Sequence, residues 1–170
     1  MLKHPGRKGK LMEREEAAYW SSLGWAGSHR VPGSGAFAGL PGDVILHPPF
    51  FRRLRMECKA YKDGWKSGDK DLAGEEVLIL PRSGDNLIYL ARDTFRQIIE
   101  GVESGKLGLF ALISNAKQSK ARNAMAESYL DKGDDIFSIK ANFKQPNYVM
   151  RASFFWKFMQ AANGWKVGQS

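Results

Sequence analysis

The chain has 170 residues, of which 43% are hydrophobic, and carries a formal net charge of +8 with three histidines and one cysteine. This composition excludes a disordered chain and an internal disulfide, and it disfavours a zinc site. The apolar runs are too short to span a bilayer, and no hydrophobic stretch follows the basic start, so we expect a cytoplasmic protein without a membrane segment. The positive charge favours a polyanionic partner such as nucleic acid.

The first sixty residues predict a helix followed by two strands. Residues 10–23 combine strong helix formers with apolar residues at helical spacing, and Gly24 follows as a stop signal. Glycine and proline predict a loop over residues 29–43. Residues 43–47 and 53–60 predict strands whose close connection indicates an antiparallel pair. In the second strand, Glu57 and Lys59 share one face, opposite an apolar face that includes Cys58.

The remaining segments predict a mixture of strands and helices. Residues 62–73 indicate a loop with a short helical piece, and residues 76–80 and 86–90 indicate strands. Asp93 is suited to N-cap a helix over residues 93–106. Residues 107–113 fit a strand or a helix, 119–130 and 153–162 predict helices, and 136–143 predict a strand. For the aromatic cluster in residues 153–162, core or interface packing is favoured over base stacking.

Three ionic side chains are expected to meet at one end of the first strand pair. Asp43 opens one strand, and Glu57 and Lys59 lie on one face of the next. Two carboxylates beside a lysine suit Mg²⁺ or Mn²⁺, because hard cations prefer oxygen ligands. Such a metal activates water and neutralises phosphate charge, which points to phosphodiester hydrolysis. For an isolated Glu-x-Lys, a salt bridge on a solvated strand face is the simpler interpretation.

Two sets of motifs in the chain resemble known nucleases. The motifs PGD at residues 41–43 and ECK at residues 57–59 resemble the PD-(D/E)xK nuclease superfamily. RKGKLMER at residues 7–14 and HRVPGSG at residues 29–35 look like the N-terminal half of the archaeal-type Holliday junction resolvases, which have phage relatives. The resemblance implies a restriction-endonuclease-like α/β fold with a small mixed central β-sheet flanked by helices. It further implies a nuclease core at residues 1–104, followed by a helical or mixed C-terminal extension at residues 105–170.

The resemblance also implies which residues act, with Mg²⁺ as the cofactor and Mn²⁺ as a substitute. The catalytic and metal-binding set is Glu13 (through water), Asp43, Glu57, Lys59 and the backbone carbonyl of Cys58. The DNA-binding set is Arg7, Lys8, Arg30 and Ser34. We choose Glu13 over Glu15 and Glu16 because Glu13 holds the position that the family uses after Arg-Lys-Gly.

The expected function is resolution of four-way DNA junctions by paired symmetric hydrolysis, in a prokaryotic or phage-infected cell. Symmetric cuts imply a two-fold homodimer, for which the aromatic C-terminal segment is a candidate contact. One alternative is a nuclease that acts on flaps, ends or duplex DNA, because one core serves many substrates. Others are a non-catalytic DNA-binding protein on a nuclease-like core, and a basic globular protein whose ionic strand face is only solvated surface.

Overall fold

A computed structural model describes residues 5–33, 42–61, 77–101, 111–113, 120–141 and 145–169 of the protein. The described helices are α1 (Pro5–Ser22), α2 (Arg92–Ile99), α4 (Lys120–Asp131) and α5 (Ala152–Gln169). The first four strands are β1 (His29–Arg30), β2 (Val44–Leu46), β3 (Leu54–Tyr61) and β4 (Val77–Leu80). The other four are β5 (Leu87–Ala91), β6 (Ala111–Ile113), β7 (Ile136–Ala141) and β8 (Asn147–Arg151).

The described strands form one eight-stranded mixed sheet in the order β1-β2-β3-β7-β8-β5-β4-β6. The pairs β3–β7 and β4–β6 are parallel, and the other pairs are antiparallel. The predicted α/β class with a mixed sheet and flanking helices is confirmed, although the sheet is larger than the small one expected. The division at residue 104 stays a prediction, but strands from both sides of it share this sheet, because β7 and β8 lie between β3 and β5.

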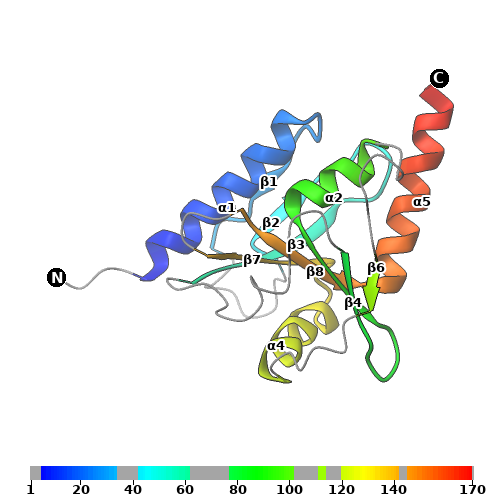
Figure 1. The fold of residues 1–170 in the computed structure, drawn as a ribbon. Helices are drawn as coiled ribbons and strands as arrows, with labels where there is room; N and C mark the ends of the chain where they lie inside the picture. Colours follow the sequence, from blue (N-terminus) through cyan, green and yellow to red (C-terminus); the bar gives the residue numbers. More distant parts are fainter. Residues whose placement is uncertain are drawn as a thin grey trace.

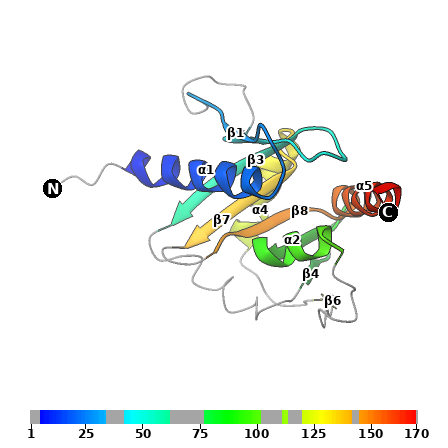
Figure 2. The ribbon, with the colours of Figure 1, turned by 90° about the horizontal axis from the view of Figure 1, so that it is seen from above.

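Helices cover both faces of the sheet. In Figure 1, α1, α2 and α5 lie on one side of the strands and α4 lies on the other, and Figure 2 shows the first three helices from above. The core divides in the same way. Leu54 and Met56 of β3 belong to a cluster with residues of α1, α2 and α5, whereas Phe137 and Ile139 of β7 pack with residues of α4. Each face of the sheet therefore has its own hydrophobic layer.

The first helix shows how local sequence sets its own boundaries and its buried side. Met12, Glu16 and Trp20 are four residues apart and are all at most 2% exposed, so they form one stripe facing the sheet. The predicted stop at Gly24 is confirmed. Gly24 has a φ of +96°, a left-handed conformation that allows the Trp25 N–H to return to the Trp20 carbonyl at 3.0 Å.

The predicted antiparallel pair β2–β3 is confirmed. The strands predicted at residues 76–80 and 86–90 are β4 and β5, which also pair in antiparallel orientation. The predicted N-cap at Asp93 is wrong. The N-cap is Ala91, which makes no side-chain capping bond, and Asp93 lies in the first turn of α2, where it accepts a hydrogen bond from the Tyr19 hydroxyl at 3.0 Å. Helix α2 ends at Ile99, before Gly101 with a φ of +71°. The rest of the helix predicted to residue 106, and the loop predicted at residues 62–73, lie outside the described residues.

The C-terminal part contains one strand that the pattern missed. Helix α4 and strand β7 are confirmed, and the ambiguous segment around residue 112 is strand β6. Strand β8 was not predicted, because its central residues Tyr148, Val149 and Met150 are all at most 2% exposed and so show no alternation. In α5, Phe155 and Phe158 are buried, which confirms the core interpretation for these two, whereas Trp156 is 56% exposed. None of the described helices combines the length and apolar character that a membrane crossing requires.

Candidate active site

The start of β2 places Asp43 against the middle of β3. Its backbone N–H donates to the Met56 carbonyl at 2.8 Å, and its carbonyl accepts from the Val31 N–H at 2.8 Å. The carboxylate oxygen Oδ2 of Asp43 accepts the backbone N–H of Cys58 at 3.0 Å. The N–H and C=O of one strand residue point to the same edge, so the Cys58 carbonyl also points toward the Asp43 side of β3.

Glu57 and Lys59 lie on the face of β3 that α4 covers. In the parallel register with β7 they stand beside Phe137 and Ile139, which belong to the hydrophobic layer under α4. The ammonium Nζ of Lys59 lies 2.5 Å from Oε1 of Glu57 and 4.9 Å from the ring centre of Tyr129 in α4. Glu57 is only 8% exposed and the Lys59 side chain is 33% exposed, so the carboxylate of this pair is buried while the ammonium partly reaches solvent.

The charges of this cluster act on one another. Burial raises the pKa of Glu57; the hydrogen bond from Lys59 opposes this, and the negative charges of Asp43 and Glu13 raise it further. For Lys59, burial lowers the pKa, but the hydrogen bond and the charge of Glu57 outweigh burial, so the net pKa is raised. Lys59 is therefore an ammonium donor at neutral pH and not a free amine.

The three glutamates of α1 have different partners. Glu13 is 8% exposed and forms an ion pair with Arg30 of β1, and its charge contributes to the raised pKa of Glu57. Glu15 pairs with Lys140 of β7. Glu16 is fully buried in a separate network. The choice of Glu13 over Glu15 and Glu16 stays a prediction.

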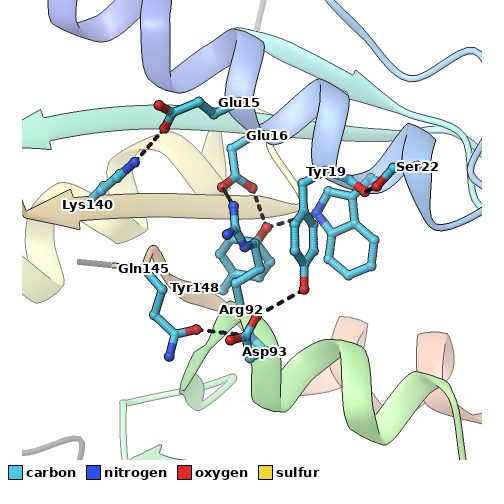
Figure 3. Close-up of polar contacts among 10 residues, drawn as sticks. Glu15, Glu16, Tyr19, Ser22, Arg92, Asp93, Lys140, Gln145 and Tyr148 are labelled. Carbon is cyan, nitrogen blue, oxygen red and sulfur yellow. Dashed lines mark hydrogen bonds and ion pairs between the residues drawn. The ribbon is translucent and has the colours of Figure 1, made fainter. Parts of the chain in front are cut away.

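Glu16 belongs to a buried network that joins α1 to α2 and β8 (Figure 3). Its carboxylate accepts a bond from Nη1 of Arg92 at 2.9 Å and another from the hydroxyl of Tyr148. Trp20 donates its indole N–H to the Tyr148 oxygen at 2.9 Å. Burial raises the pKa of Glu16, while the charge of Arg92 and the two hydrogen bonds oppose the increase. This network anchors the helix that carries Glu13.

The expected DNA contacts are only partly described. Arg30 lies in β1 and holds Glu13. Arg7 and Lys8 lie in the first turns of α1, and Ser34 lies outside the described residues. The structure therefore shows two ion pairs, Glu13 with Arg30 and Glu57 with Lys59, and bonds Asp43 to the backbone of Cys58. The positions of the other basic side chains stay predictions.

One acidic residue beside this cluster was missed by the sequence reasoning. Asp134 lies between α4 and β7 and is 6% exposed. Burial, followed by the charges of Glu57 and Asp43, raises its pKa to about 7. Its only sequence signal is the run DKGDD at residues 131–135, which resembles an ordinary helix C-terminus with a capping glycine.

The donor set has the chemistry that Mg²⁺ prefers, because it consists of carboxylate oxygens and a backbone carbonyl. One buried oxygen, Oδ1 of Asp134, has no hydrogen-bond partner among the described residues. Across the described ranges, no group of three or more acidic, histidine or cysteine side chains is already arranged to hold a metal ion. The available oxygen donors are of the chemical type that binds a divalent cation, and binding of a cation here is a proposal.

Fold and site together define an α/β protein with a carboxylate and lysine cluster where an antiparallel strand pair begins. No protein-family model and no curated protein matches this chain. Among solved structures, the chain is similar to Hjc, a Holliday junction resolvase from Archaeoglobus fulgidus, an archaeal hyperthermophile. The identity is 13%, the TM-score is 0.33, and the match covers 92% of this chain and 96% of that one. A similarity of this strength carries no conclusion about function.

Proposed function

We propose that the protein is a Mg²⁺-dependent DNA endonuclease that resolves four-way junctions by paired symmetric phosphodiester hydrolysis. The observation that carries the proposal is the juxtaposition at β2 and β3. Asp43 is bonded to the backbone of Cys58, and Glu57 and Lys59 flank that same residue as an ion pair. A PD-(D/E)xK nuclease requires two carboxylates and a lysine in this arrangement, and the three residues belong to the motifs that resemble that superfamily.

The residues that would hold Mg²⁺, or Mn²⁺ in its place, are Asp43, Glu57 and the Cys58 carbonyl, with Glu13 contacting it through water. When bound, the cation lowers the pKa of a water ligand and neutralises charge on the scissile phosphate. The buried setting of Glu57 favours this role, because a cation relieves the like-charge interaction that raises its pKa.

Lys59 supplies a fixed positive charge beside the reacting phosphate. Its raised pKa keeps it protonated, so it donates hydrogen bonds to the attacking water or to a phosphate oxygen and does not act as a base. The contact with Glu57 and the ring of Tyr129 orient the ammonium group. These contacts support the role, because electrostatic stabilisation is most effective when the charged group is oriented before substrate binds.

DNA binding is proposed for the basic residues around this site. The guanidinium of Arg30 is held by Glu13 while its side chain is 23% exposed, so it is oriented and still able to contact a phosphate. Arg7, Lys8 and Ser34 are the further proposed contacts. The net charge of +8 supports binding to the DNA backbone, with an affinity that falls as salt rises.

Two symmetric cuts require two active sites, so we propose a homodimer. Trp156 and Trp165 of α5 are 56% and 40% exposed, and they are candidates for the dimer contact or for contact with DNA strands. Light scattering on the full chain, with and without junction DNA, measures the assembly. A monomer in the complex would contradict this part of the proposal.

The experiment that tests the function is cleavage of a synthetic mobile four-way junction against a linear duplex of matching sequence. Wild type, Asp43→Asn and Asp131→Asn are compared in Mg²⁺ and in EDTA. Asp131 is a matched control, because its carboxylate is 66% exposed and pairs with Arg151 away from the cluster. We expect paired symmetric nicks in the junction only, lost in EDTA and in Asp43→Asn and retained in Asp131→Asn.

Other outcomes select the alternatives. Equal cutting of duplex would retain the nuclease and reject the junction specificity. Tight binding to the junction without cleavage under any condition would favour a non-catalytic DNA-binding protein. Weak binding that does not respond to salt would indicate a basic protein with no specific nucleic-acid function.

A further inference from the structure

Asp134 is held rigidly beside the proposed active site by the end of α4 and the start of β7. Gly133 has a φ of +106°, and the N–H groups of Gly133 and Asp134 donate to the carbonyls of Leu130 and Tyr129, both at 3.2 Å. This is the hydrogen-bond pattern of a Schellman motif. The next residue, Asp135, donates its N–H to the Arg55 carbonyl of β3 at 2.9 Å. Asp134 is thus fixed from both sides.

The carboxylate of Asp134 points toward the glycine that precedes Asp43. A Cβ atom placed on Gly42 would lie 3.1 Å from Oδ1 of Asp134 and 3.2 Å from Cβ of Arg55. Arg55 is two residues before Glu57, on the same face of β3. The carboxylate of Asp134 therefore lies on the same side of the sheet as Glu57, next to the backbone that positions Asp43.

The charge of Arg55 acts on Asp134, but one of its carboxylate oxygens has no hydrogen-bond partner among the described residues. This oxygen, Oδ1, is inaccessible to solvent. Asp135, by contrast, receives bonds from the guanidinium of Arg52 and the backbone N–H of Arg55. A buried carboxylate oxygen without a donor is costly, and a divalent cation would lower that cost.

We propose that Asp134 is a third acidic ligand, direct or through water, of the divalent cation held by Asp43 and Glu57. This inference rests on the proposed metal-dependent function. It adds a ligand from the α4–β7 junction, distant in sequence from both motifs of the nuclease pattern. The cation would then contact three segments of the chain, and its binding would tie β2, β3 and β7 together.

The test is calorimetric titration of the full chain with Mn²⁺, without DNA, in wild type, Asp134→Asn, Asp43→Asn and Asp131→Asn. We expect at least a tenfold weaker Mn²⁺ affinity in Asp134→Asn, a loss of binding in Asp43→Asn, and no change in Asp131→Asn. Affinity in Asp134→Asn within twofold of wild type, with binding lost in Asp43→Asn, would overturn this inference and leave the proposed function standing. No Mn²⁺ binding by wild type would overturn both.

Thermal unfolding separates a ligand from a merely structural carboxylate. In EDTA, Asp134→Asn is expected to unfold at the same temperature as wild type or higher, because the substitution removes a repelling charge. Added Mn²⁺ is expected to raise the unfolding temperature less in Asp134→Asn than in wild type. A lower unfolding temperature in EDTA with an undiminished Mn²⁺ effect would show a structural role and overturn the inference. If Asp134→Asn does not fold, Asp134→Ser takes its place in both measurements.

Discussion

The buried carboxylates on the two sides of the sheet differ in how their charge is neutralised. On the side of α1 and α2, Glu16 has no exposed surface, and Arg92 and Tyr148 satisfy its oxygens. On the side of α4, Glu57 and Asp134 are almost as buried. Lys59 pairs with Glu57, but the charge of Arg55 only partly offsets the burial and the negative charges that raise the pKa of Asp134, and Oδ1 of Asp134 has no hydrogen-bond partner among the described residues.

On the proposed function, this difference distinguishes carboxylates that stabilise the fold from carboxylates that bind a cation. A carboxylate whose neutralising partners are built into the fold contributes to the stability and register of the elements it joins. A group of carboxylates that exceeds its internal cations carries a standing electrostatic cost, which an external cation removes. Such uncompensated sites are where ligand binding and catalysis are expected.

The largest expected effect on stability comes from removing Arg92, the cation that pairs with the buried Glu16. Arg92→Ala leaves Glu16 buried without its cation, and we expect a loss of about 3–5 kcal/mol in the free energy of unfolding. Arg96→Ala, in the same helix, removes a pair at 3.4 Å whose glutamate, Glu100, is 46% exposed, and we expect a loss below about 1 kcal/mol. Urea denaturation measures both. Equal losses would mean that the Glu16 network is not the anchor of α1.

The next effect concerns rate and not stability. Lys59→Met removes the donor proposed to act on the phosphate, and we expect cleavage to slow by about 10²–10³-fold. Lys132→Met is the control, because its ammonium lies 5.4 Å from the same Tyr129 ring, and it is not proposed to act at the site. Single-turnover cleavage of the junction measures both rates. A similar decrease in cleavage rate in both variants would mean that the effect comes from loss of positive charge near α4 and not from a specific role of Lys59.

The raised pKa of Asp134 also predicts that the stability of the protein depends on pH. The pKa of Asp134 is raised from its ordinary value to about 7, so the folded protein binds a proton that the unfolded chain releases between about pH 4 and pH 7. Wild-type stability in EDTA therefore falls as pH rises through this window. Asp134→Asn removes this loss, which is about 2–4 kcal/mol for a shift of this size. Urea denaturation at pH 4 and pH 8 measures it, and Asp131→Asn is expected to follow wild type.

The smallest expected effect tests how closely the carboxylate of Asp134 approaches the backbone of Gly42, which precedes Asp43. Gly42→Ala introduces strain at a φ of +87° and places its Cβ 3.1 Å from Oδ1 of Asp134, whereas Gly84→Ala, at a φ of +116°, meets nothing within 4 Å. We expect Gly84→Ala to cost about 1–2 kcal/mol and Gly42→Ala about 1–2 kcal/mol more. Equal losses of stability in the two variants would mean that Asp134 and Arg55 move to accommodate the added methyl group without cost.

Local pattern predicted much of the framework around the site. Alternation in β3 places Met56 and Cys58 in the core and Glu57 and Lys59 on the opposite face, as the structure shows. The stop at Gly24 was equally local, because a left-handed glycine ends a helix within a few residues. These predictions succeeded because the signal and its consequence lie in one short segment.

Other features depended on contacts between distant segments. Strand β8 lacks alternation because it is buried between β5 and β7. The residues of β8 do not by themselves indicate that strands flank it on both sides. Asp93 was predicted as an N-cap, but the approach of α1 gave it the Tyr19 hydroxyl as a partner. In both cases packing against remote elements overrode the local preference.

By itself, the sequence determined the class of fold, the antiparallel pair that carries Asp43 and Glu57, and the kinds of side chain available to the site. Only the tertiary structure decided that Glu16 is neutralised inside the protein, that Glu13 meets Arg30, and that Asp134 joins the acidic cluster. The physical reason is that the behaviour of a carboxylate depends on burial and on nearby charges. Both are set by the parallel pairing of β3 with β7 and by the helices that cover each face of the sheet.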